Sequence, residues 1–247
     1  ESSSPSNTAG AQGGPGFPAV SLYDNVMLQK RLVEDVFGDA RIALVMGWSM
    51  GGMQALQWGC LFPTQVRAVL ATCCTARCYP HNRVFLEGVK AALTCDHAFE
   101  NGRYRTPPER GLRAFGRVYA GWAYSQAFFR HELWREQGFG SIEELLRFWE
   151  QDHLGQDAND LLTVLNTWQN GDISDNPVFG MDFDAALSAI AMPTRMMPCT
   201  TDLYFTREDA SEDGLRMPGA TVESLESDWG HVAGGAGREA ASHNRIL

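Results

Sequence analysis

A G-x-S-x-G motif at residues 47–51 indicates covalent chemistry at Ser49. The apolar run 42–46 precedes it, and a helical pattern follows it. A serine between a strand and a helix is typical of a nucleophile elbow, a tight turn that raises the hydroxyl above the sheet. We expect Gly47 and Gly51 to leave room for that turn. The alternative is that Ser49 only caps the helix.

A nucleophilic serine needs a base and an acid, because its hydroxyl is almost never ionised near neutral pH. Asp202 follows the apolar run 192–199, and His231 lies in a glycine-flanked loop after another predicted strand, 220–225. A carboxylate just past a strand end lies at the active-site edge of a parallel sheet. The order Ser49, Asp202, His231 is the order that a nucleophile elbow requires.

Other assignments stay open at this point. Asp228 is a rival acid, although it lies only three residues from the histidine that it would orient. Asp202 could instead cap a helix that opens near residues 206–209, and His231 could be held by a local hydrogen bond. The Met50 amide supplies one oxyanion donor at the helix N-terminus. A second donor normally comes from a loop after an early strand, and no such loop can be identified in the sequence.

The residues before the elbow contain no earlier strand pattern. Residues 1–19 are rich in Ser, Gly and Pro and are typical of a loop. Residues 20–37 predict one helix, whose apolar side we expect to contain Val26, Leu28, Leu32, Val33 and Val36. We therefore expect the N-terminal strands of the sheet to be absent from this chain, with the chain being the C-terminal part of a larger protein. The alternative is a reduced sheet with an exposed edge.

These elements predict an α/β fold with a mostly parallel sheet flanked by helices. We expect residues 1–79 to form a core with the elbow, residues 80–190 a helical cap, and residues 191–247 the core that carries acid and base. In the predicted cap, segments 112–122 and 142–149 space apolar residues at three and four. A cap over the serine would exclude bulk water and select the substrate.

Composition excludes several classes of protein. The chain has 247 residues, a formal net charge of -10 and 44% apolar residues. The acidic balance disfavours nucleic acid and anionic membranes as partners. The sequence has no apolar run of membrane-spanning length and no signal-peptide pattern, so we expect a cytoplasmic protein.

The six cysteines do not indicate a disulfide scaffold in a chain of this length. Cys73, Cys74 and Cys78 cluster ahead of His81, but they lack the paired C-x2-C spacing of a zinc site. We expect no metal, and reduced, buried thiols.

Several stretches resemble the homoserine O-acetyltransferase-like branch of the α/β-hydrolases. The matching stretches are Ser4-Pro5-Ser6, the run from Phe17 to Gln29, the elbow G-W-S-M-G-G-M-Q, Asp157-Ala158-Asn159, Thr201-Asp202-Leu203-Tyr204 and Gly230-His231. The resemblance implies acyl-serine chemistry in two half-reactions, typically with acetyl-CoA as donor and a small alcohol as acceptor. The family's sheet also begins well before the S-P-S stretch.

The departures from that family bear on the substrate. Where the homoserine enzymes carry an acidic residue after G-H, this chain has Val232, and Trp48 replaces a smaller residue in the elbow. The arginine usual before the aspartate of the first helix is Tyr23. The absence of a carboxylate at position 232 disfavours homoserine as acceptor. We expect Trp48, Tyr204 and Val232 to contact the substrate.

Three functions follow from the sequence. The first is an acyltransferase that moves an acetyl or short acyl group from an acyl-CoA co-substrate to a small alcohol other than homoserine. The alternative is a carboxylesterase with water as acceptor, and a third function is a binding module on an enzyme fold. We expect no bound cofactor and a small-molecule substrate. The sequence also allows a homodimer, or an N-terminal fragment of the same precursor that completes the sheet.

Overall fold

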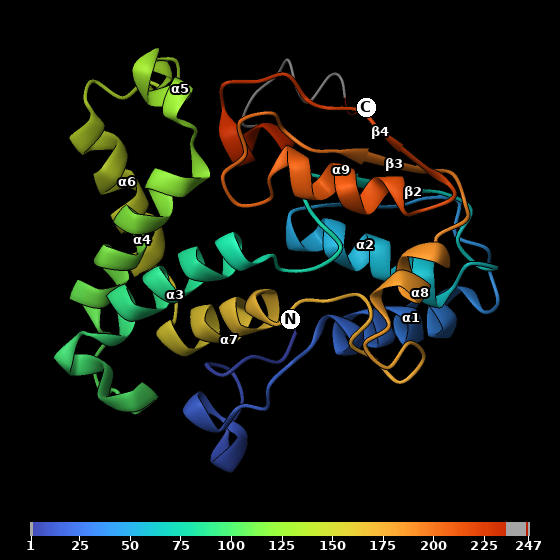
Figure 1. The fold of residues 1–247 in the computed structure, drawn as a ribbon. Coiled ribbons are helices and arrows are strands. Elements are labelled where there is room, and N and C mark those ends of the chain that lie inside the picture. The colour runs from blue at the N-terminus through green and yellow to red at the C-terminus, as the bar shows by residue number, and fades with distance from the viewer. Residues whose placement is uncertain (1, 236–245, 247) are drawn as a thin grey trace.

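The described strands form a parallel sheet, in agreement with the mostly parallel sheet that was predicted. The computed structural model describes residues 2–235 and residue 246, and its four-stranded sheet has the order β1-β2-β3-β4 (Figure 1). The strands are β1 (Val45–Trp48), β2 (Val69–Thr72), β3 (Thr194–Met197) and β4 (Ala220–Val222). Because parallel strands end at the same edge of a sheet, the segments that follow β1, β3 and β4, which contain Ser49, Asp202 and His231, meet there.

Helices α2 (Met50–Leu61) and α9 (Arg207–Leu215) cover one face of this sheet. A Cβ added at Gly59 of α2 would lie 3.3 Å from the Val69 side chain, and one at Gly214 of α9 would lie 2.4 Å from the Val222 side chain. The register places Val69 and Val222 on the same face. The two glycines therefore let both helices pack closely on that face.

The remaining long helices lie before β1 or between β2 and β3 in the chain. Helix α1 (Leu22–Phe37) packs on α2. Between β2 and β3 lie α3 (Pro80–Thr94), α4 (Glu109–Ala123), α5 (Gln126–Arg130), α6 (Ile142–Leu154), α7 (Ala158–Gln169) and α8 (Phe183–Ser188). Helices α3 to α7 extend to one side of the sheet, and α8 lies beside α1 and α2 (Figure 1). In the part of the chain that the structure describes, no helix has the length and apolar character needed to cross a membrane.

Helix α1 differs from the prediction in the side that it buries. It starts at Leu22 because Ser21 forms a capping box with Asp24. Leu22 and Val26 are buried, whereas Leu28, Leu32 and Val36 of the expected apolar side are 60–65% exposed. The reason is that α2 contacts only one stripe of α1, and no described residue covers the other apolar stripe.

The second face of the sheet carries exposed apolar side chains at β1. Leu44 is 47% exposed and Met46 is 54% exposed, and no described strand pairs with the outer edge of β1. An open strand edge next to apolar side chains is a surface for self-association. The expectation that further strands complete the sheet stays a prediction.

We expect Met46→Glu to reduce concentration-dependent self-association, because it places a charge on this open face. The free energy of unfolding should change by no more than about 0.5 kcal/mol, as for most surface substitutions. The measurement is light scattering over a range of protein concentrations. Leu215→Glu, at a position that is 86% exposed on α9, is the control with the same charge change. An equal effect of both substitutions would show that net charge, and not this face, governs association.

A buried carboxylate joins α9 to the segment after β2. Asp213 is fully buried, and its carboxylate accepts hydrogen bonds from the Ala76 amide (2.7 Å) and the Tyr79 hydroxyl (2.7 Å). Burial raises the pKa of Asp213 from 3.8 to about 6, although both hydrogen bonds act in the opposite direction. The carboxylate thus fixes the start of α3 relative to the sheet at a cost in desolvation when it is ionised.

The pKa of Asp213 is higher in the folded chain than in the unfolded chain. The stability that protonated Asp213 contributes is therefore complete below about pH 4 and is lost as the pH rises through about 6. At about 1.4 kcal/mol per pH unit, the loss is on the order of 3 kcal/mol. Asp213→Asn should remove this dependence, and urea unfolding between pH 4 and 7 measures it. Glu212→Gln on the same helix is the control and should keep the wild-type profile. A stability gain with rising pH specific to wild type would refute the assignment.

Candidate active site

Ser49 lies at the sharp turn between β1 and α2. Its φ is 59° and its ψ is -132°, a conformation that L-residues rarely adopt and that costs on the order of 1–3 kcal/mol. Gly47 makes the turn possible, since a Cβ there would lie 2.0 Å from the Gly51 carbonyl oxygen. The local geometry is that of a nucleophile elbow.

Gly51 does not have the steric role that the sequence suggested. A Cβ at Gly51 would meet nothing within 4 Å, whereas a Cβ at Gly52 would lie 2.4 Å from Cys74 Sγ. The close approach therefore occurs one residue later than predicted. Only the tertiary position of Cys74, two residues after the end of β2, distinguishes the two glycines.

The Met50 amide belongs to the first turn of α2, where backbone donors have no acceptor within the helix. The Ser49 carbonyl accepts the amides of Gly52 (2.8 Å) and Met53 (3.2 Å), which anchors the start of the helix. The Met50 amide can thus donate a hydrogen bond to negative charge that develops beside Ser49. Its part as oxyanion donor stays a prediction.

Asp202 and His231 form a buried pair. His231 Nδ1 lies 2.8 Å from Asp202 Oδ2, and the Asp202 side chain is fully buried. Asp202 Oδ1 accepts the amides of Tyr204 (2.8 Å) and Phe205 (3.2 Å), so the carboxylate is held on both oxygens. With Nδ1 donating to the carboxylate, Nε2 of the neutral ring is an acceptor and can take a proton from a hydroxyl.

The structure shows which of the two candidate carboxylates, Asp202 or Asp228, contacts His231. Asp228 contacts the exposed His131, with 2.9 Å between its Oδ2 and the ring Nδ1, and the pair with His231 is made by Asp202. Asp202 does not cap α9, because Thr206 does so by accepting the Asp209 amide (3.2 Å). The contact that the sequence predicted for the acid is therefore made by Asp202, and its catalytic role stays a prediction.

A threonine links the loop of the acid to the loop of the base. The Thr201 hydroxyl donates to the Ser227 carbonyl (2.7 Å) and accepts the Gly230 amide (3.1 Å). These bonds fix the backbone on both sides of the pair, one residue before Asp202 and one residue before His231. The link limits how far the two side chains can separate.

Three aromatic rings surround His231. The Trp48 indole stacks on the imidazole, with 4.9 Å between ring centroids, and donates its N–H to the His231 carbonyl (3.1 Å). Tyr204 meets the imidazole edge-on at 4.7 Å, and Phe205 lies at 5.6 Å. These rings hold the imidazole in one orientation. Phe205 is not predicted from the sequence, where its only signal is its position three residues after the predicted acid.

The three residues expected to contact substrate differ in exposure. Trp48 is 39% exposed and stacks on His231, and Tyr204 is 2% exposed, with its hydroxyl donating to the Tyr119 carbonyl (3.0 Å). Val232 is buried in the core. Their contact with substrate stays a prediction. What the structure shows is that Trp48 and Tyr204 contact His231.

The N-terminal segment docks on α7. Asp160 accepts hydrogen bonds from the Ser6 amide (2.9 Å) and the hydroxyls of Ser4 (3.2 Å) and Ser6 (2.5 Å). Asp157 caps the same helix, and the Asn159 side chain donates to the Gly102 carbonyl (2.9 Å). The S-P-S stretch therefore meets the residue that follows D-A-N, and these contacts set the position of α7.

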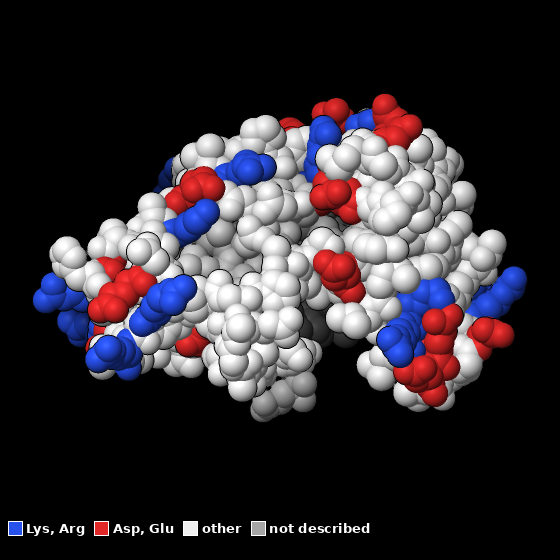
Figure 2. Space-filling view, turned by 90° about the horizontal axis from the view of Figure 1, so that it is seen from below, with Lys and Arg blue, Asp and Glu red and all other residues white. Residues whose placement is uncertain are grey.

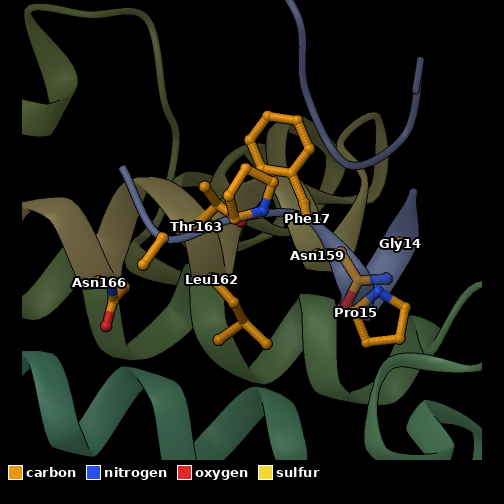
Figure 3. A pocket seen from close by; sticks show the side chains of 9 residues that line it. Gly14, Pro15, Phe17, Asn159, Leu162, Thr163 and Asn166 are labelled. Atoms are coloured by element: carbon orange, nitrogen blue, oxygen red, sulfur yellow. The ribbon is translucent and has the colours of Figure 1, made fainter. Parts of the chain in front are cut away.

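Cavities formed by the described residues lie along α7. One of about 150 Å³ contains Met50 and is bounded by Phe17, Asn25 and Thr167 among others. A second, of about 260 Å³, lies among α3, α4, α6 and α7. Val164 lines both of them. The third, of about 300 Å³, shares Phe17 and Thr163 with the first, and in it Pro15 and Phe17 face Asn159, Leu162, Thr163 and Asn166 of α7 (Figure 3).

The six cysteines are free thiols, and four of them are buried, including Cys73 and Cys74. Among residues 2–235, no group of three or more His, Cys, Asp or Glu side chains is placed to hold a metal ion.

Comparison with known proteins places this site in a family. Residues 7–241 match the model of the alpha/beta hydrolase family. The chain is similar to an ethyl acetate hydrolase of Pseudomonas veronii (35% identity, 94% of this chain and 66% of that protein). It is also similar to a homoserine O-acetyltransferase of Chlorobaculum tepidum (29% identity, 91% and 64%). The solved structure of the acetyl esterase MekB superposes with a TM-score of 0.94 (33% identity, 99% and 71%).

The chain belongs to the alpha/beta hydrolase family and has its fold. Its relatives include both ester hydrolases and homoserine O-acetyltransferases, so the resemblance seen in the sequence is confirmed. The chain spans about two thirds of the length of the curated relatives it matches.

Substitutions in the triad test this site. We expect Ser49→Ala to abolish turnover of p-nitrophenyl acetate, with a loss of up to about 10⁶ in kcat, and His231→Ala to cost nearly as much. Asp202→Asn should cost less, about 10⁴-fold, because the imidazole loses its orienting acceptor. Asp228→Asn is the matched control and should keep wild-type activity. Full activity of Asp202→Asn with an inactive Asp228→Asn would show that the acid is wrongly assigned.

Proposed function

We propose that this chain carries the catalytic triad of a carboxylesterase for short, neutral esters. The observation that carries the proposal is the buried Asp202–His231 pair, which lies at the same sheet edge as the strained Ser49. An imidazole held by a carboxylate can activate a serine hydroxyl. The similarity to an ethyl acetate hydrolase and to an acetyl esterase supports water as the acceptor.

The reaction proceeds in two balanced steps. Ser49 Oγ attacks the ester carbonyl while His231 Nε2 takes its proton, and the Met50 amide stabilises the oxyanion. The bond to the alkoxy oxygen then breaks, His231 returns the proton to that oxygen, and the alcohol leaves an acyl-serine. Water then attacks the acyl group while His231 accepts its proton. His231 donates that proton to Ser49 Oγ as the acyl bond breaks, which releases the carboxylic acid product and restores Ser49.

Charge near the site favours a neutral substrate. The acidic side chains that line the two cavities sharing Val164 are Asp152 and Asp160, and His153 lines the larger cavity. Burial lowers the pKa of His153, so its ring is neutral at pH 7. The two carboxylates would repel the phosphate groups of an acyl-CoA. A neutral ester meets no such repulsion.

The second candidate is an acyltransferase that moves a short acyl group from acyl-CoA to a small alcohol. The similarity to a homoserine O-acetyltransferase favours it, because the same triad serves both acceptors. The two reactions differ only in what attacks the acyl-serine.

The proposal is tested by intact-mass analysis of the purified protein, quenched after brief exposure to ethyl acetate or to acetyl-CoA. We expect an acetyl adduct on Ser49 with ethyl acetate, its loss in plain buffer, and release of acetate at the same rate. Ser49→Ala is the control and should show no adduct. An adduct from acetyl-CoA that survives in buffer and is removed by an added alcohol would establish the transferase. Failure of a fluorophosphonate to label Ser49, in material known to contain the complete protein, would instead indicate a binding module.

A further inference from the structure

The segment that joins α4 to α5 contacts the His231 loop (residues 228–235). The Ser125 hydroxyl donates a hydrogen bond to the Asp228 carbonyl. The Trp229 ring packs edge-on against Phe128 of α5, with 5.3 Å between ring centroids. These contacts fall on the two residues that lie three and two positions before the imidazole in the chain.

Gly230, which directly precedes His231, allows the two segments to approach closely. Its φ is 69°, in the left-handed region that favours glycine. A Cβ at this position would lie 2.7 Å from the Ser125 amide nitrogen and 3.0 Å from the Ala123 carbonyl oxygen. The backbone of the His231 loop therefore packs directly on the backbone at the end of α4.

The Ser125 hydroxyl makes two hydrogen bonds. It donates to the Asp228 carbonyl, and it accepts the Phe128 amide (2.9 Å), which caps α5. Ser125 is only 2% exposed, and a buried polar group that loses its partner is costly because water does not replace the bond. The Asp228 carbonyl is thus held at the N-terminus of α5.

The same group of helices holds the loop that carries Asp202. The buried Asn82 of α3 donates to the Tyr204 carbonyl (2.5 Å), and the Tyr204 hydroxyl donates to the Tyr119 carbonyl of α4 (3.0 Å). The Tyr204 amide in turn donates to Asp202. The helices between β2 and β3 therefore contact the loops of both members of the Asp202–His231 pair through separate hydrogen bonds.

Helix α4 is itself held against α6. A Cβ at Gly116 of α4 would lie 2.6 Å from the Trp149 carbonyl oxygen of α6, so the two helices pack closely. Arg117 of α4 also pairs with Glu143 of α6 (2.6 Å). Figure 2 shows acidic and basic side chains grouped at the end of the molecule where these helices lie. Because α4 is supported in this way, Ser125, two residues beyond its end, has a fixed place.

We propose that Ser125 is a positioning residue for His231, through which the helices between β2 and β3 set the place of the imidazole. The inference rests on the proposed esterase function and deepens it, because it names a residue outside the triad on which the rate depends. The imidazole must lie within hydrogen-bond reach of Ser49 Oγ, and a displacement of about 1 Å can lower a rate about 100-fold. Ser125 is buried, so it acts through the His231 loop and not by contact with substrate.

Hydrolysis of p-nitrophenyl acetate by the purified protein tests this role. We expect Ser125→Ala to lower kcat about 10-fold and to keep KM within about twofold of wild type, because the reaction step loses its geometry while binding does not. Ser125→Thr keeps a hydroxyl and should restore most of the lost kcat. Ser141→Ala is the matched control, since Ser141 caps α6 by accepting the Glu144 amide (3.2 Å), and it should keep the wild-type kcat.

The rate of labelling by a fluorophosphonate gives a second measurement that needs no ester. The label reacts with Ser49 rapidly when His231 is placed to accept its proton. We expect Ser125→Ala to be labelled about 10-fold more slowly than wild type, but to the same final extent. Each kcat is expressed per labelled Ser49, so that a loss of folded protein does not count as a loss of rate.

The outcomes separate the role of Ser125 from the esterase function. An unchanged kcat per labelled Ser49 in Ser125→Ala, or an equal loss in Ser141→Ala, would overturn the role of Ser125. So would a Ser125→Thr variant that is no faster than Ser125→Ala. If wild type hydrolyses no ester but is labelled faster than Ser125→Ala, the positioning role holds and the esterase function fails.

Discussion

The hydrogen bond between Asp202 and His231 is the interaction on which the site depends. It joins the segments that follow β3 and β4, and it fixes the imidazole tautomer, so that the second ring nitrogen can accept a proton. A buried carboxylate is stable only when its oxygens are satisfied, and here the amides of Tyr204 and Phe205 supply the remaining bonds. The same turn that satisfies Asp202 therefore brings both aromatic rings against His231.

The parallel sheet makes this interaction possible. Its strands end at one edge, so segments more than 100 residues apart in sequence, those with Ser49 and Asp202, are brought to one place. Helices α2 and α9 both approach the same sheet face closely through glycines. Asp213 further constrains the arrangement, since it holds the segment after β2 against α9 and so sets where α3 begins.

The helices between β2 and β3 give the site its chemical character. Docking of Ser4 and Ser6 on Asp160 sets the position of α7, and α7 lines both a small cavity at Met50 and an aromatic one among its neighbours. In the proposed esterase, the carboxylates that line these cavities would favour neutral substrates. Esterase and acyltransferase chemistry share every step up to the acyl-serine, so what distinguishes them is which acceptor these surroundings admit.

The sequence by itself determined the elbow, the parallel strands and the order of Ser49, Asp202 and His231, because these depend on local pattern and on a fixed chain order. Tertiary structure alone decided which contacts these residues make. That Asp202 and not Asp228 pairs with His231, that Gly52 and not Gly51 is the crowded glycine, and that Trp48 stacks on the base all depend on residues distant in sequence. The exposed side of α1 shows the same limit: periodicity identifies an apolar stripe, but only packing partners decide whether it is buried.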